Sequence, residues 1–114
     1  MIERIDTICL KVRDVEKSSK WYQDVLGFRV AFKDKGYVVL NVGEGGVPLT
    51  IEEGKSEGHT NGSYPIFFSN TIEQLHKSLE EQGVQVDSLH EDGFNHYFDF
   101  YDPDGNRLQV CFFE

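Results

Sequence analysis

Hydrophobic and polar positions follow the same pattern twice along the chain. Residues 5–30 (IDTICLKVRDVEKSSKWYQDVLGFRV) align with residues 62–86 (GSYPIFFSNTIEQLHKSLEEQGVQV) at a constant offset of 57 as far as the end of a helical stretch. Each copy opens with a segment that predicts a strand, at 7–12 and at 64–69. We therefore expect an internal structural repeat.

A helix is predicted after the first strand of each copy. The apolar residues at a helical period, which we expect to be buried, are Val15, Tyr22 and Leu26 in the first copy and Ile72, Leu75 and Leu79 in the second. Asp14 and Thr71 are expected to cap the helix starts, and Thr71 and Gln74 have the spacing of a capping box. Gly27 and Gly83 stand where a left-handed C-cap favours glycine.

The rest of each copy predicts three strands, the last two joined as a hairpin. The strands are expected at 28–33, 37–42 and 47–52 in the first copy, and at 84–89, 96–101 and 106–112 in the second. The order is therefore β-α-β-β-β, twice. We predict one α+β domain over residues 1–114, with repeat one at 1–53, a polar linker at 54–62 and repeat two at 63–114. The two curved mixed sheets are expected to form a cup with the helices on its outside.

Composition narrows the class of protein. The net charge is −9, and residues 58–114 contain only Lys77 and Arg107 as basic residues, so a nucleic-acid partner is not expected. No apolar stretch is long enough for a membrane span, so no membrane partner is expected either. An acidic start argues against a signal peptide, and two cysteines cannot form a disulfide framework, which together favour a cytoplasmic location.

Three motifs in order resemble those of the vicinal oxygen chelate superfamily, which includes glyoxalases, dioxygenases and bleomycin resistance proteins. They are Val12-Arg13-Asp14 before the first helix, Trp21-Tyr22-Gln23-Asp24-Val25-Leu26-Gly27 within it, and Asp102-Pro103-Asp104-Gly105-Asn106 before the last strand. Each also has a structural explanation as a helix cap, a packing surface or a tight turn. The resemblance covers nearly the whole chain and implies the paired βαβββ fold, frequently as a homodimer.

The resemblance also implies four positions for the ligands of a divalent metal ion. In metal-dependent members these positions hold mainly His and Glu, but here they hold Thr7, Thr50, Tyr64 and Gln109. Neutral hydroxyl and amide groups are poor replacements for imidazole and carboxylate ligands. We therefore expect no metal cofactor. A relocated metal site that uses Glu52, His59 or His96 is the alternative.

Strand alternation predicts which side chains share the face of those four positions. Cys9 and Cys111 fall on the same face as Thr7 and Gln109, and Phe68 on the face of Tyr64. His96, on the strand before the Asp102 turn, is added as a ligand-orienting residue. The candidate ligand-binding residues are thus Thr7, Cys9, Thr50, Tyr64, Phe68, His96, Gln109 and Cys111.

Three functions remain open at this point. The favoured one is a metal-free protein, similar to bleomycin-binding members, that holds a small cationic or aromatic organic molecule in the cup. The second is a glyoxalase-like lyase or isomerase, either with a displaced metal site or with Tyr64 or His96 in metal-free acid–base chemistry. The third is an interaction module with a filled cup and a sheet edge that pairs in a homodimer. The sequence assigns no catalytic residue.

Overall fold

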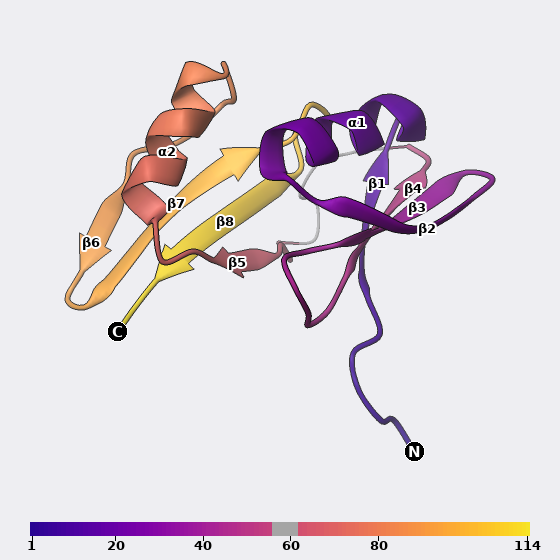
Figure 1. Cartoon of the computed structure of the whole chain (residues 1–114), viewed down its shortest axis with the longest axis horizontal. Helices are drawn as coiled ribbons and strands as arrows, with labels where there is room; N and C mark the ends of the chain where they lie inside the picture. Colours follow the sequence, from indigo (N-terminus) through magenta and orange to yellow (C-terminus); the bar gives the residue numbers. More distant parts are fainter. Residues whose placement is uncertain (56–61) are drawn as a thin grey trace. The chain divides into compact units, whose positions relative to one another are not determined.

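The two halves of the chain form similar α+β units in the computed structural model. The structure describes residues 1–55 and 62–114, so His59 and most of the expected linker lie outside the described residues. The units are Met1–Ser56 and Glu57–Glu114, each with one helix and a four-stranded sheet (Figure 1). The βαβββ order in each half is confirmed. The single domain and the cup between the repeats stay predictions.

The first unit contains a mixed sheet with one helix packed on it. Its elements are β1 (Ile8–Val12), α1 (Val15–Leu26), β2 (Arg29–Asp34), β3 (Tyr37–Asn41) and β4 (Leu49–Glu53). The strands lie in the order β1-β4-β3-β2, with β1 parallel to β4 and the other pairs antiparallel. α1 packs on β3 and β4, so one face of this sheet is covered by the helix.

Helix α1 begins and ends at the residues that the sequence indicates. The Asp14 carboxylate accepts a hydrogen bond of 3.1 Å from the backbone N–H of Lys17, and Gly27 ends the helix at a φ of 73°. Tyr22 is fully buried, with its ring stacked 5.9 Å from that of Phe28. Burying a side chain of this size is a major contribution to the stability of the unit.

The second unit repeats this arrangement. Its elements are β5 (Ile66–Phe68), α2 (Ile72–Glu81), β6 (His90–Asp92), β7 (Asn95–Tyr101) and β8 (Arg107–Phe112). The strands lie in the order β5-β8-β7-β6, with β5 parallel to β8 and the other pairs antiparallel. α2 packs on β7 and β8. Its Leu79 is fully buried and its Ile72 is 4% exposed.

Two local predictions for the second unit are wrong. Residues 84–89 do not form a regular strand, and within them Val86 makes an isolated bridge to Phe100. The strand that pairs with β7 is β6, which is three residues long. The capping box at Thr71 does not form either. Its side chain makes no capping bond, and its hydroxyl lies 3.3 Å from that of Ser69 instead.

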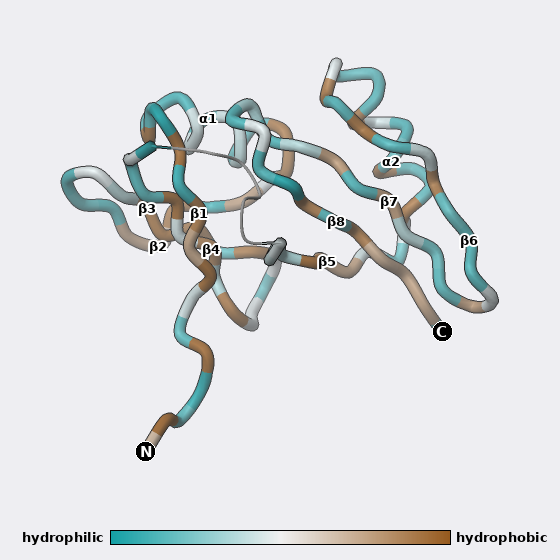
Figure 2. The backbone as a smooth tube through the Cα atoms, turned by 180° about the vertical axis from the view of Figure 1, so that it is seen from behind, coloured by the Kyte–Doolittle hydropathy of each residue, from teal (hydrophilic) through white to brown (hydrophobic). Residues whose placement is uncertain are grey.

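Hydrophobic and polar residues alternate along the longer strands, which gives each sheet two different faces (Figure 2). The buried apolar residues of the strands are Val12, Val38, Leu40, Leu49 and Ile51 in the first unit and Phe98, Phe100, Leu108 and Val110 in the second. They lie on the helix side of their sheets. The residues between them in sequence therefore form the opposite face, which we call the helix-free face of each sheet.

A buried carboxylate organises the turn that leads into β8. Asp102 Oδ1 accepts hydrogen bonds from the backbone N–H groups of Asp104 and Asn106, both at 2.9 Å, and Oδ2 accepts one from the Asn106 amide at 2.9 Å. Gly105 completes the turn at a φ of 84°. The turn fixes the position of Arg107, the first residue of β8.

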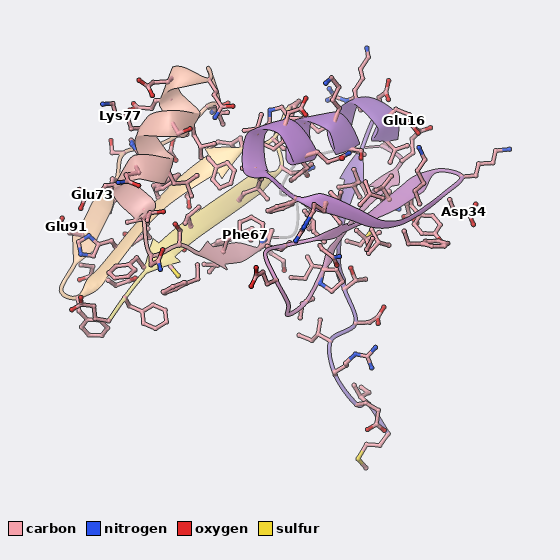
Figure 3. All side chains as sticks on the ribbon, in the orientation of Figure 1. Glu16, Asp34, Phe67, Glu73, Lys77 and Glu91 are labelled. Carbon is pink, nitrogen blue, oxygen red and sulfur yellow. The ribbon has the colours of Figure 1, made fainter. Side chains whose placement is uncertain are left out.

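Within the described parts of the chain, no helix is both long and apolar enough to cross a membrane. α1 has 12 residues and α2 has 10, and each carries charged side chains on its exposed side, such as Glu16, Glu73 and Lys77 (Figure 3). This fits helices that each cover one face of a sheet.

Candidate functional site

The helix-free face of the second sheet carries a set of polar and aromatic side chains from three strands and the segment before β5. These residues are Tyr64, Phe68, Asp99, Arg107, Gln109 and Cys111. The register brings them together, because Gln109 lies opposite Asp99 on one side and opposite Ile66 on the other. Four of the predicted ligand-binding residues, namely Tyr64, Phe68, Gln109 and Cys111, therefore share one face of one unit.

Arg107 is at the centre of the polar contacts on this face. Its Nε and Nη2 atoms donate to Asp99 Oδ2 at 3.0 and 2.8 Å. The other carboxylate oxygen, Asp99 Oδ1, accepts a 2.8 Å hydrogen bond from the Gln109 amide. The guanidinium carbon lies 3.8 Å from the centre of the Tyr64 ring, the geometry of a cation–π contact. Arg107 thus contacts Tyr64 directly and Gln109 through Asp99.

This network is partly shielded from water. The side chain of Asp99 is 17% exposed and that of Arg107 is 31% exposed. Water and salt screen a charge pair at this depth less than one at the surface. The carboxylate at one edge and the ring on one face hold the guanidinium group in one orientation. The site therefore contains a positive group that is held at one edge by Asp99 and on one face by the ring of Tyr64.

The far end of this face is apolar. Phe68 is 56% exposed and lies opposite Cys111 in the register, with its ring 5.3 Å from that of Phe113. Burial raises the pKa of the Cys111 thiol, so this cysteine is a neutral group near pH 7. The face thus combines a polar end at Arg107 with an apolar end at Phe68.

The helix-free face of the first sheet carries the other predicted residues. The hydroxyl groups of Thr7 and Thr50 lie 2.7 Å apart, and Thr7 Oγ1 also donates to the backbone carbonyl of Pro48 at 3.0 Å. Cys9 lies opposite Thr50 in the parallel register of β1 and β4. Thr7, Cys9 and Thr50 are therefore neighbours, as the alternation predicts, and the two threonines satisfy each other.

Glu52, the carboxylate of the proposed alternative metal site, is also on this face. It forms an ion pair with Lys11 on the neighbouring strand. Partial burial, followed by the negative charge of Glu52, raises the pKa of the Cys9 thiol, and Lys11 opposes this shift. Cys9 is therefore neutral near pH 7, and Glu52 has a cation as its partner.

His96 does not share the face of the other predicted residues. It lies opposite Phe112 and in phase with the buried Phe98, which places it on the side of α2. There it lines a groove of about 330 Å³ beside the start of α2, together with Thr71 and Ile72. Its Nδ1 is 3.4 Å from a carboxylate oxygen of Glu91. The structure therefore places His96 on the opposite face of this sheet from Gln109, and its expected role in orienting a ligand stays a prediction.

Two residues of the polar network were missed from the sequence. Asp99 and Arg107 stand at alternating positions in phase with Gln109, and Arg107 is one of the two basic residues after residue 57. The strand alternation could have placed both residues on the helix-free face.

In residues 1–55 and 62–114, no three or more His, Cys, Asp or Glu side chains are grouped so that they could hold a metal ion.

Comparison with known proteins identifies the family of this chain. The model of the glyoxalase/bleomycin resistance protein/dioxygenase superfamily matches residues 4–110. No curated protein sequence is similar enough to be matched to the chain. Among solved structures, an integron cassette protein from the mobile metagenome of the Halifax Harbour sewage outfall is 27% identical, with a TM-score of 0.81, over 96% of this chain and 98% of that one.

Two further solved structures share the fold at lower identity. A glyoxalase family protein from Bacillus anthracis is 20% identical, with a TM-score of 0.82, over 100% of this chain and 98% of that one. The fosfomycin resistance protein FosX from Listeria monocytogenes, in a complex with Mn(II) and sulfate, is 18% identical, with a TM-score of 0.83, over 100% of this chain and 93% of that one. The match of the family model over most of the sequence shows that this chain belongs to the glyoxalase/bleomycin resistance protein/dioxygenase superfamily.

Proposed function

We propose that this protein binds a small organic molecule on the helix-free face of its second sheet, without a divalent metal ion. The observation that carries the proposal is the guanidinium group of Arg107, which lies 3.8 Å from the centre of the Tyr64 ring and is joined to Gln109 through Asp99. Tyr64 and Gln109 are the positions at which the family resemblance implies metal ligands in the second repeat.

The chemistry of these side chains does not fit a divalent ion. Zn²⁺, Mn²⁺ and Mg²⁺ sites in proteins are built from imidazole, carboxylate or thiolate ligands that offset the cost of dehydrating the ion. Here Gln109 uses its amide to donate to Asp99, and Asp99 is paired with a cation. The nearby positive charge of Arg107 would repel a second cation. In the first unit, the corresponding hydroxyl groups of Thr7 and Thr50 bond to each other.

The same face has the character of a site for an organic ligand. Such sites are mostly apolar, with a few polar groups that orient the ligand. Ile66 and Phe68 are 55% and 56% exposed, so apolar surface is available beside the polar network of Arg107, Asp99 and Gln109. A ligand that covers these side chains would gain roughly 25 cal/mol of binding free energy per Å² of apolar surface buried.

A thermal-shift panel together with elemental analysis tests this proposal. The purified protein is expected to contain no stoichiometric Zn, Mn, Ni or Fe, and its melting temperature should be the same with and without a chelator. Small aromatic compounds that bind the native state should raise the melting temperature, by an amount that grows with the logarithm of ligand concentration once this exceeds the dissociation constant.

A Phe68→Ala variant provides the matched test of the site. It removes an exposed side chain, so it should leave the unliganded melting temperature nearly unchanged and reduce the ligand-induced shift. Phe94→Ala is the control, because Phe94 is 73% exposed and lies in the turn between β6 and β7. A bound ion whose removal abolishes ligand binding, or a panel without a single stabilising compound, would contradict the proposal.

A further inference from the structure

The polar contacts on the helix-free face of the second sheet also indicate the charge of the ligand. We infer that Arg107 is an oxyanion-binding residue, and that the ligand is a small acid whose carboxylate is held by the guanidinium group and whose apolar part lies against Ile66. This inference rests on the proposed function and names the ligand class of the same site.

The first argument is the number of hydrogen-bond donors that Arg107 retains. A guanidinium group has five N–H donors in a planar fork. Two of its nitrogen atoms, Nε and Nη2, donate to Asp99, and both bonds end on the single oxygen Oδ2. Among the described residues, Asp99 is the acceptor bonded to this fork and occupies one edge of it, so the edge formed by Nη1 and Nη2 keeps N–H groups for a second acceptor. A carboxylate accepts two parallel hydrogen bonds from such an edge.

The second argument is that the guanidinium group is positioned before the ligand arrives. Asp99 holds one edge, and the ring of Tyr64 covers one face at 3.8 Å. Asp99 is itself held through its other oxygen by the Gln109 amide. A side chain that is already ordered loses less conformational entropy on binding than a free surface arginine.

The third argument concerns the acids near this face, where Asp87 accepts a 3.3 Å hydrogen bond from the Tyr101 hydroxyl and Asp99 is paired with Arg107. Both oxygens of Asp99 already accept hydrogen bonds, from Arg107 and from Gln109, so its negative charge is neutralised locally. A cationic ligand would have to compete with Arg107 for this carboxylate, whereas an anionic ligand meets the unused edge of the guanidinium group. These contacts therefore favour an anion over a cationic ligand, which was one of the two ligand types expected from the sequence.

The size of the ligand follows from the register. Ile66 lies opposite Gln109, which is two residues along β8 from Arg107, so its side chain is about 7 Å along the strand from the guanidinium-bearing residue. A carboxylate on a single aromatic ring spans this distance. Benzoate is therefore a suitable probe, and benzyl alcohol and benzylammonium provide the same ring with neutral and positive groups.

The experiment is a titration of the full chain with each of these three probes, near neutral pH and at constant ionic strength. Binding is measured from the NMR chemical shifts of the backbone amides. Benzoate should bind more tightly than the other two and should shift the amides of Gln109 and Arg107. Arg107→Gln should weaken benzoate binding by about tenfold, the effect expected from losing hydrogen bonds to a charged group. Arg107→Lys keeps the charge without the fork and should lose severalfold.

Lys77→Gln is the matched control, because it removes the only other basic residue of the second half and lies on α2, exposed (Figure 3). It should change benzoate affinity less than twofold. The amide spectrum of each variant reports whether it is folded, and if Arg107→Gln is not folded, Arg107→Lys decides the comparison.

Three outcomes would overturn the inference: benzoate binding no tighter than benzyl alcohol, equal losses in the Arg107 and Lys77 variants, or tighter binding of benzylammonium. If one of these occurs while the thermal-shift panel yields a stabilising compound, the ligand class is wrong and the proposed binding function stands. If the panel also yields no compound, the proposed function fails as well.

Discussion

Replacing Asp102 by alanine is expected to destabilise the second unit far more than removal of an exposed carboxylate of that unit. Asp102 is 4% exposed and its two oxygens accept three hydrogen bonds of 2.9 Å, from two backbone N–H groups and the Asn106 amide. The Asp102→Ala variant leaves those donors without their acceptor, and Asn106 is itself only 5% exposed. Water therefore has little access to the unpaired groups.

The magnitude follows from these contacts. A hydrogen bond to a charged group contributes about 1.5–3 kcal/mol, and a buried donor left unpaired costs about 1–3 kcal/mol. The three bonds share one carboxylate and are not additive, so we expect the free energy of unfolding to fall by about 3–4 kcal/mol. For a small domain with a total stability of roughly 5–15 kcal/mol, this is a large fraction.

Urea denaturation followed by circular dichroism measures this loss. The midpoint should move to lower urea with an unchanged slope, because the surface exposed on unfolding stays the same. Asp92→Ala is the control: Asp92 is an exposed acid of the same unit, and its removal should change stability by no more than about 0.5 kcal/mol. Equal midpoints for the two variants would refute the structural role assigned to the Asp102 carboxylate.

Two further predictions concern the first unit. Gly27→Ala should lower the free energy of unfolding by about 1 kcal/mol, because Gly27 has a φ of 73° that alanine adopts only with strain. Gly45→Ala is the control and should have almost no effect, because Gly45 has no positive φ and there is open space around an added Cβ. Equal losses in the two variants would contradict this reasoning. Glu52→Gln should lower the pKa of Cys9 and raise its alkylation rate near neutral pH on the order of twofold, because burial and Glu52 raise that pKa and reduce the thiolate fraction. Mass spectrometry measures the rate, and the rate at Cys111, whose pKa is raised by burial alone, should not change.

Local features of the sequence predicted most of the secondary structure. Asp14 and Gly27 act within one or two turns of chain, so their capping roles follow from residue type and position alone. The prediction of a strand at 84–89 is wrong because strand formation does not depend on local residue type alone. Whether an extended segment becomes a strand depends on a partner far along the chain, and β7 pairs regularly with β6 instead. The expected homodimer and cytoplasmic location stay predictions.

The candidate site shows the same division. Alternation along β8 is enough to place Gln109 and Cys111 on one face, and the same rule applied to β7 places His96 on the other.

The sequence by itself determined the repeat, the order of its elements and the absence of charged ligands at Thr7, Thr50, Tyr64 and Gln109, because these depend on residue identity and short-range periodicity. Only the tertiary structure decided that Arg107 lies over Tyr64 and between it and Asp99. Those side chains come from separate segments, and their contact depends on strand register, which long-range backbone pairing sets.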